Sequence, residues 1–235
     1  MNVAIIPARG GSKRIPKKNI KQFCGQPMIA YSIQAAKGSG CFERIIVSTD
    51  DQAIASVAIE YGAEVPFFRP KELSDDFTGT IPVIRHAIEM LEQQNAKPIS
   101  AACCIYATAP FIQPLDIITG LKQLQNNVDC LYSFSVTSYP YPIQRAIKVT
   151  HDKRTEMFQP EFFNVRSQDL EDAYHDAGQF YWGRKEAWLN EKNIFSSHSM
   201  PIILPRYRVQ DIDTQEDWLS AELMFEMIMR KRKTQ

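Results

Sequence analysis

Apolar residues follow two different spacings along this chain. Short apolar runs rich in β-branched residues are typical of buried strands, and apolar residues at every third or fourth position are typical of helices that cover a sheet. Predicted strands lie at residues 3–6, 44–49, 64–69, 101–105, 130–136, 178–182, 200–204 and 207–212. Predicted helices lie at residues 28–37, 51–61, 81–94, 116–126 and 214–230. Because strands and helices alternate, we expect an α/β fold with parallel strands.

The alternation of predicted strands and helices has one long interruption, and prolines and polar residues modify the predicted elements near residues 66 and 80. Pro66 predicts that the strand at 64–69 is short or lies at an edge, and Thr80 can cap the helix that follows it. After the Tyr-Pro-Tyr-Pro loop at 139–142, residues up to about 176 mix short apolar pieces with many charges and show no clear period. We interpret residues 138–176 as an insertion into a single domain spanning residues 1–235.

The first predicted strand runs directly into a basic, glycine-rich loop. Gly10 and Gly11 allow a close approach of the backbone to a ligand, and their N–H groups can point at an anion. The loop carries five cations within ten residues, at positions 9, 13, 14, 17 and 18. It lacks both the Walker A and the GxGxxG spacing. A solvated basic loop without a ligand is the alternative, but a strand, glycines and cations together favour a phosphate site at the carboxyl edge of the sheet.

Composition excludes a global electrostatic role. The 235 residues include 27 Lys and Arg and 27 Asp and Glu, so no net charge recruits nucleic acid or a membrane. The apolar run before Arg9 is too short for the core of a signal peptide, and no stretch approaches membrane-spanning length. We therefore expect a cytoplasmic protein. The five cysteines are scattered and predict reduced thiols rather than a disulfide framework.

Two acidic residues near the C-terminus form a second candidate site. Asp211 and Asp213 stand two residues apart on a predicted strand, so both carboxylates can point the same way. Paired hard oxygen ligands suit Mg²⁺, which completes its coordination with water and substrate phosphates. The alternative is helix capping by Asp213 or by the capping box at 214–217, which would explain one acid but not both. None of the four histidines is paired at metal or triad spacing, and we retain only His175 as a site candidate.

Several stretches in order along the chain resemble the CMP-sialic acid synthetases, or acylneuraminate cytidylyltransferases. They are Ile-Pro-Ala-Arg-Gly-Gly-Ser-Lys-Arg-Ile-Pro-Lys-Lys-Asn at 6–19, Val-Ser-Thr-Asp-Asp at 47–51, Arg-Pro-Lys-Glu-Leu-Ser-Asp-Asp at 69–76, Ala-Thr-Ala-Pro-Phe at 107–111 and Asp-Ile-Asp-Thr at 211–214. The stretches at 74–82, 166–171 and 173–183 are most similar to the branch of that family that uses pseudaminic acid. The resemblance implies a three-layer, Rossmann-like, mostly parallel sheet of the nucleotidyltransferase type, with a small inserted dimerisation subdomain.

The resemblance also implies roles for individual residues. The CTP site would contain Arg9, Gly10, Gly11, Lys13, Lys18, Asn19, Arg69 and Thr78, with Arg69 helping to read cytosine. Asp211 and Asp213 fall on the Mg²⁺ ligands, and Arg9, Lys13, Lys18 and Asp211 would carry the catalysis. The sugar carboxylate needs a cation, for which Arg166 in the insertion is our candidate, and we expect the rest of the sugar site to contain Tyr106, Gln168, His175, Gln179 and Tyr181. Tyr106 is a departure, because sialic acid synthetases commonly have glutamine there, and it favours a different sugar.

The implied reaction is attack by the anomeric hydroxyl of a nine-carbon acid sugar on the α-phosphorus of CTP, with release of pyrophosphate. Alternatives are the same reaction on N-acetylneuraminic acid, legionaminic acid or Kdo, and a nucleotide-binding protein without turnover. The family also implies a homodimer with residues 138–176 at the interface, where they could lend groups to the neighbouring site.

Overall fold

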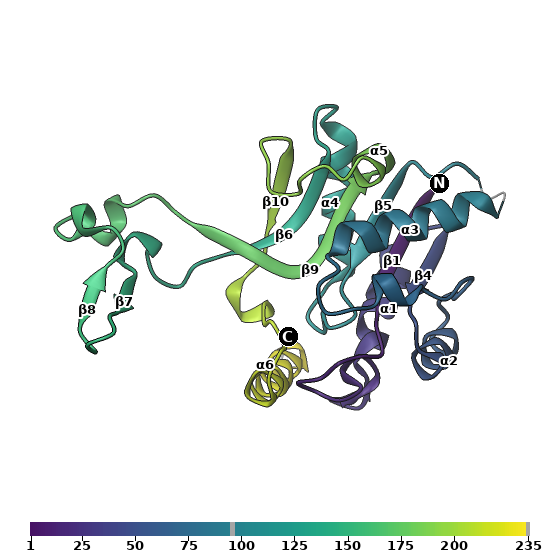
Figure 1. The fold of residues 1–235 in the computed structure, drawn as a ribbon, viewed down its shortest axis with the longest axis horizontal. Helices are drawn as coiled ribbons and strands as arrows, with labels where there is room; N and C mark the ends of the chain where they lie inside the picture. The colour runs from purple at the N-terminus through teal and green to yellow at the C-terminus, as the bar shows by residue number, and fades with distance from the viewer. Residues whose placement is uncertain (95–96, 234–235) are drawn as a thin grey trace.

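A computed structural model describes residues 1–94 and 97–233 and contains one six-stranded sheet (Figure 1). Its strands are β1 (Asn2–Pro7), β4 (Arg44–Ser48), β5 (Ala101–Ile105), β6 (Tyr132–Ser138), β9 (Tyr174–Arg184) and β10 (Ser199–Ile203). The order across the sheet is β10-β6-β9-β5-β1-β4. Strand β9 is antiparallel to both of its neighbours, and the other strands are parallel to one another. The predicted mostly parallel sheet is confirmed.

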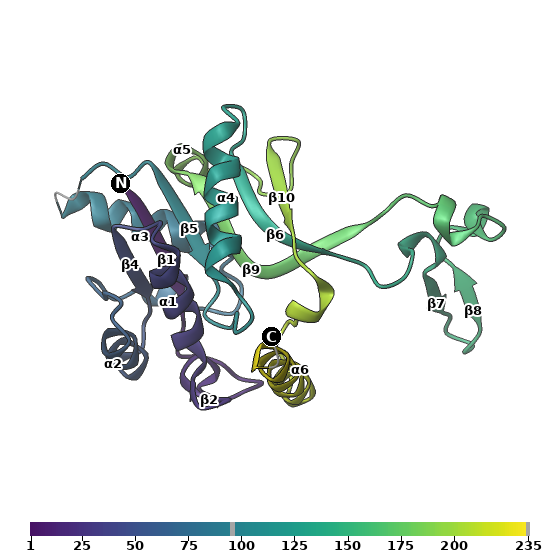
Figure 2. The ribbon, with the colours of Figure 1, turned by 180° about the vertical axis from the view of Figure 1, so that it is seen from behind.

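Helices cover both faces of the sheet, because successive side chains of a buried strand point to opposite sides. Ala4 and Ile6 of β1 belong to one apolar cluster, and Val3 and Ile5 belong to another. The first cluster packs against α1 (Met28–Ser39), α2 (Gln52–Glu60) and α4 (Pro114–Asn126). The second packs against α3 (Thr80–Gln93) and α5 (Lys185–Leu189), which lie on the opposite face (Figures 1 and 2). The predicted three-layer α/β fold is confirmed.

The C-terminal helix α6 (Gln215–Lys233) does not cover the sheet. It packs Trp218 and Ala221 against Ile15 and Phe23, next to the short strands β2 (Gln22–Phe23) and β3 (Gln26–Pro27). This third cluster attaches the segment before α6 to the loop after β1. No helix over residues 1–94 and 97–233 combines the length and the apolar character needed to cross a membrane.

Residues 139–173 leave the sheet between β6 and β9 and form an arm that projects from the rest of the chain (Figures 1 and 2). The arm contains the hairpin of β7 (Ile147–Val149) and β8 (Thr155–Met157). Strand β9 connects the arm to the body: Tyr174 at its start pairs with Ser138, and Arg184 at its end pairs with Ala101. Short 3-10 helices lie at Lys18–Ile20, Lys71–Leu73, Ile143–Arg145, Pro160–Phe162, Ser167–Asp169 and Arg206–Arg208.

Three local predictions were wrong. Residues 64–69 form only one bridge, between Glu64 and Ile46, because Pro66 cannot donate to a ladder. Residues 207–212 form no strand: a 3-10 helix at 206–208 follows Pro205, and the extended residues after it have no strand partner among the described residues. Thr80 does not cap α3, since Gly79 is the N-cap residue and the Thr80 hydroxyl bonds to Tyr106 instead. The predicted strand at 178–182 is longer, and α5 was not predicted.

Candidate active site

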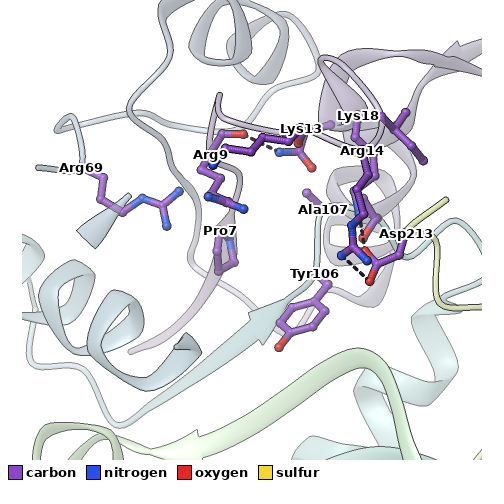
Figure 3. A pocket seen from close by; sticks show the side chains of 13 residues that line it. Pro7, Arg9, Lys13, Arg14, Lys18, Arg69, Tyr106, Ala107 and Asp213 are labelled. Carbon is purple, nitrogen blue, oxygen red and sulfur yellow. Dashed lines mark hydrogen bonds and ion pairs between the residues drawn. The ribbon is translucent and has the colours of Figure 1, made fainter. Parts of the chain in front are cut away.

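A pocket of about 260 Å³ opens at the carboxyl edge of the sheet, where β1 and β5 end (Figure 3). Parallel strands bring their following loops together at this edge. The pocket is lined by Pro7, Arg9, Ser12, Lys13, Arg14, Ile15, Lys18, Asn19, Arg69, Tyr106, Ala107, Thr108 and Asp213. The basic loop, one acid of the C-terminal pair and the position that departs from the sialic acid pattern therefore meet in one place.

Carboxylates from distant segments hold four cations of the basic loop. Asp76 bridges two of them, accepting from Arg9 Nη1 at 2.7 Å and from Lys13 Nζ at 2.5 Å. Asp213 pairs with Arg14 Nη2 at 2.7 Å and with Lys18 Nζ at 3.2 Å. Both acids keep these cations together at the pocket.

The backbone of the loop is held by glycine and asparagine. A Cβ at Gly10 would lie 2.7 Å from Asp51 Oδ2 and 2.9 Å from its Cβ, so only glycine fits there. The Gly10 N–H donates to Asp50 Oδ1, at 2.9 Å, so it does not point at an anion in the pocket as the sequence suggested. Buried Asn19 donates its side-chain N–H to the Arg9 carbonyl at 3.0 Å, which closes the loop on itself. Gly10 and Gly11 shape the loop and do not line the pocket.

Arg69 is a buried cation without a complete set of partners. Arg69 is only 6% exposed, yet its Nε and Nη2 atoms have no hydrogen-bond partner among the described residues. Burial lowers the pKa of its guanidinium, and the nearby carboxylate of Asp50 opposes that effect. Since buried N–H groups are nearly always paired in folded proteins, these donors indicate a ligand with hydrogen-bond acceptors. Figure 3 shows Arg69 on one side of Arg9, with Arg14, Lys18 and Asp213 on the other.

The acid pair lies on the extended segment before α6. Asp211 and Asp213 flank buried Ile212, and Asp213 lines the pocket. Burial, and then the charge of Asp213, raise the pKa of Asp211, so the two carboxylates act on each other. Helix capping does not use them, because Thr214 Oγ1 accepts from the Asp217 N–H and Asp217 Oδ2 accepts from the Thr214 N–H.

Asp211 is exposed beside the pocket and Asp213 is paired with Arg14 and Lys18, and because neither caps the helix, both could bind a Mg²⁺ that also binds substrate phosphates. The described part of the chain has no cluster of three or more acidic, histidine or cysteine ligands. The protein would thus supply two oxygen ligands, and the remaining ones would come from phosphate and water.

Tyr106 separates the basic loop from β9. Its N–H donates to the Gln179 carbonyl at 2.9 Å, its carbonyl accepts from Ser32 Oγ at 2.7 Å, and its hydroxyl lies 2.8 Å from Thr80 Oγ1. The ring of Tyr181 lies next to it, with 5.3 Å between ring centroids. Burial raises the pKa of the Tyr106 phenol, so the group stays neutral. Because antiparallel β9 starts at the carboxyl edge, Gln179 and Tyr181 lie beside the end of β5.

Other predicted sugar residues lie on the arm or at its base. Arg166 and Gln168 are exposed on the arm, and Arg166 pairs at 2.7 Å with Asp169 of the short helix that follows it. His175 packs its ring against Tyr139, at 4.9 Å between centroids, where the arm leaves the sheet. None of the three lines the pocket described above.

Some residues of the site were missed or misplaced by sequence reasoning. Thr78 was predicted to bind CTP, but its hydroxyl donates to the Glu72 carbonyl at 3.2 Å and it does not line the pocket. Asp76 was not singled out, although it holds two loop cations. Its contacts join residues 63 and 67 positions apart, which no local pattern shows. The sequence feature that could have identified Asp76 is the pair of neighbouring acids, Asp75 and Asp76, in a polar turn.

Comparisons with known proteins agree with this geometry. The chain matches a family model described as cytidylyltransferase over residues 3–230. A pseudaminic acid cytidylyltransferase of Campylobacter jejuni (serotype O:2) is 46% identical, over 96% of this chain and 97% of that protein. A CMP-N,N'-diacetyllegionaminic acid synthase of Legionella pneumophila is 34% identical, over 96% of each chain. A solved structure of a CMP:2-keto-3-deoxy-manno-octonic acid synthetase complexed with CTP has a TM-score of 0.70 at 15% identity, covers 96% of this chain and 98% of that one, and supports the fold alone.

The family model begins within β1 and ends within α6, so it spans the sheet, the arm and every residue that lines the pocket. Relatives of high identity also align with nearly the whole chain rather than with one segment of it. The resemblance seen in the sequence motifs is thereby confirmed, and the chain belongs to the cytidylyltransferase family.

Proposed function

We propose that this protein transfers CMP from CTP to the anomeric hydroxyl of pseudaminic acid and releases pyrophosphate. Relatives at 45–46% identity over nearly the full length carry the name pseudaminic acid cytidylyltransferase, which supports this choice among acid sugars. In the pocket, the observation that carries the proposal is buried Arg69, whose Nε and Nη2 have no acceptor among the residues that the structure describes. The cytosine base offers carbonyl and ring-nitrogen acceptors of the kind that a guanidinium binds.

The residues of the pocket divide the work on CTP. Arg9, Lys13 and Lys18 would neutralise the triphosphate, and Arg69 would orient the base. Asp211 and Asp213 would hold Mg²⁺, which when bound neutralises phosphate charge and makes the sugar hydroxyl a better nucleophile. A new bond then forms between the anomeric oxygen and the α-phosphorus as the bond to the pyrophosphate oxygen breaks, and the hydroxyl proton is released to water. Positioning and charge neutralisation dominate such transfers, so no covalent catalyst is required.

Pyrophosphate release from CTP with a panel of acid sugars tests the proposal. We expect turnover to be fastest with pseudaminic acid. Faster turnover with N-acetylneuraminic acid, legionaminic acid or Kdo would assign the enzyme to that sugar, and CTP binding without turnover would indicate a nucleotide-binding protein. Because the reaction consumes CTP, we also propose a cytoplasmic location.

The acid pair has its own test. Asp211→Asn should abolish turnover while the circular dichroism spectrum and melting temperature stay close to those of the wild type. Asp129→Asn, on an exposed loop, is the matched control and should retain activity. Removal of divalent cations should inactivate the wild type in the same way, and Mg²⁺ should restore it. Full activity of Asp211→Asn would remove the metal assignment.

We further propose that the arm pairs with a second copy of the chain. It exposes large apolar side chains that would be covered in a homodimer, namely Ile143, Ile147, Val149, Phe158 and Phe163. Exposed Arg166 on the same arm could then bind the sugar carboxylate in the neighbouring site. A stable monomer at micromolar concentration in light scattering would contradict the dimer.

Mixing Arg166→Ala with Asp211→Asn, at a sugar concentration well below the KM of Arg166→Ala, tests whether Arg166 acts between subunits. Arg166→Ala should raise the KM for the sugar far more than the KM for CTP. If the arm acts on the partner, heterodimers of Arg166→Ala with Asp211→Asn contain one complete site, and an equal mixture should recover up to about a quarter of wild-type activity. No recovery, with heterodimers present, would show that Arg166 acts within its own chain or not at all.

A further inference from the structure

Asp76 forms ion pairs with Arg9 and Lys13, two cations that would also bind a triphosphate. Its Oδ1 accepts from Arg9 Nη1 and its Oδ2 from Lys13 Nζ, so both oxygens of one carboxylate are used by the basic loop. The carbonyl of neighbouring Asp75 also accepts from Arg9 Nη1, at 2.9 Å. These hydrogen bonds lower the pKa of Asp76, so the carboxylate is ionised at neutral pH. A single anion from the protein thus bridges the two loop cations.

A bound triphosphate and the Asp76 carboxylate would compete for the same donors. Phosphate oxygens prefer the donors that carboxylates prefer, and like charges held close together repel. Arg9 and Lys13 both line the pocket and cannot give the same N–H groups to two anions at full strength.

The segment that carries Asp76 makes few contacts with the rest of the chain. Residues 74–79 form a polar turn closed on itself, in which Asp75 Oδ1 accepts from the N–H groups of Phe77 and Thr78. Phe77 at its tip is 93% exposed and is not packed on the body. A Cβ at Gly79 would meet no atom within 4 Å, whereas the next residue, Thr80, is fixed by its bond to Tyr106. Among the described residues, the hydrogen bonds and ion pairs that join the turn to segments outside residues 70–80 are those with Arg9 and Lys13.

We propose that Asp76 is a positioning residue that stands in for the triphosphate: it holds Arg9 and Lys13 at the pocket until the phosphates of CTP replace its carboxylate and release the 74–79 turn. This inference rests on the proposed use of CTP. Its consequence is a cost in nucleotide affinity, because the ion pairs with Asp76 have to break when the phosphates bind.

Calorimetric titration of Asp76→Asn tests the inference. The variant should bind CTP more tightly than the wild type at the same salt concentration, by roughly two- to tenfold, which is the range expected for breaking partly exposed ion pairs. Asp76→Glu keeps the charge and is the matched control, and it should not gain affinity. Inorganic tripolyphosphate should show the same gain with Asp76→Asn, whereas cytidine should bind both proteins equally because it has no phosphates.

The outcomes separate this inference from the proposed function. If CTP and tripolyphosphate bind the wild type but bind Asp76→Asn equally or less tightly, Asp76 does not compete with phosphate and the inference is overturned. If neither ligand binds the wild type, the proposed function itself fails.

A fluorescent reporter tests the movement of the turn. Phe77→Trp places an indole at the exposed tip, and CTP should change its emission if the turn is released. In Phe77→Trp combined with Asp76→Asn, the emission without CTP should already be close to that of the complex. An emission that CTP does not change, with CTP binding verified by calorimetry, would show that the turn stays in place and would overturn the inference.

Discussion

Replacing Arg69 by methionine should stabilise the protein without ligand and weaken its complex with CTP. The guanidinium is 6% exposed and has two N–H-bearing atoms without partners, and leaving a buried polar group unsatisfied costs about 1–3 kcal/mol. Methionine fills a similar volume without that cost. The attraction to exposed Asp50, which does not form a direct ion pair with Arg69, is lost, and even a direct pair that is partly exposed contributes only about 0–1 kcal/mol. The net gain is about 0–3 kcal/mol, and its midpoint of about 1.5 kcal/mol corresponds to about 3–6 °C in Tm for a chain of this size.

The same change should have the opposite effect on nucleotide binding. A hydrogen bond to a charged donor contributes about 1.5–3 kcal/mol, so losing one to the base should weaken CTP binding by about 10- to 100-fold. Differential scanning calorimetry without nucleotide and isothermal titration with CTP measure the two effects.

Arg184→Met is the matched control, because Arg184 gives its Nε and Nη2 donors to the carbonyls of Cys130, Leu124 and Asn127. Methionine there leaves carbonyls unpaired and should lower Tm. If Arg69→Met lowers Tm as Arg184→Met does, the Arg69 guanidinium serves the fold rather than a ligand and our reasoning is refuted.

Other parts of the chain give further predictions. Gly183→Ala should cost at least about 1–3 kcal/mol in chemical denaturation, because its Cβ would lie 2.6 Å from Trp188 Cε2 and the core is already filled. Arg208→Met should lower the free energy of unfolding by about 3–5 kcal/mol, because it leaves the Asp116 carboxylate buried without its partner. Arg208 and Asp116 form a bidentate ion pair, and their side chains are only 14% and 12% exposed. An unchanged unfolding midpoint in either variant would contradict these packing arguments. Exposed Cys24 should react slowly with iodoacetamide at pH 7 and faster up to about pH 11, because burial and nearby glutamates raise its pKa to about 11. A plateau near pH 8 in mass spectrometry would refute the raised pKa.

The sequence pattern predicted the elements that local spacing determines. Residues 3–6 and 101–105 are continuous apolar runs because both faces of β1 and β5 are covered by helices. The pattern failed at 207–212 for a physical reason: Val209 packs on the cluster of α1 and α4, and Ile212 is buried in the cluster of α6. Apolar residues such as these indicate only that their side chains are buried. A strand also needs a neighbouring strand that pairs with its backbone, and local sequence does not show whether that neighbour exists.

The site was predictable to the extent that it is local. The basic loop could be identified from its glycines and cations, and the acid pair from its spacing. Arg69 followed only from the family resemblance, because nothing in Phe-Phe-Arg-Pro at 67–70 shows that the guanidinium is buried. Asp76 and Thr80 depend on contacts between segments that only the folded chain brings together.

The continuity of β9 limits how the arm can be exchanged between enzymes. Its eleven residues pair with β6 at both ends, through residues 174–176 and 181–183 with a register irregularity between them, and with β5 through residues 180–184. Since side chains alternate along a strand, one residue added or removed within 180–184 would turn the side chains that follow it to the wrong faces, so a graft should leave this stretch unchanged. Chimeric enzymes that keep residues 180–184 in register should fold. The sequence of the arm can therefore vary between enzymes, provided that its junction with the sheet is kept.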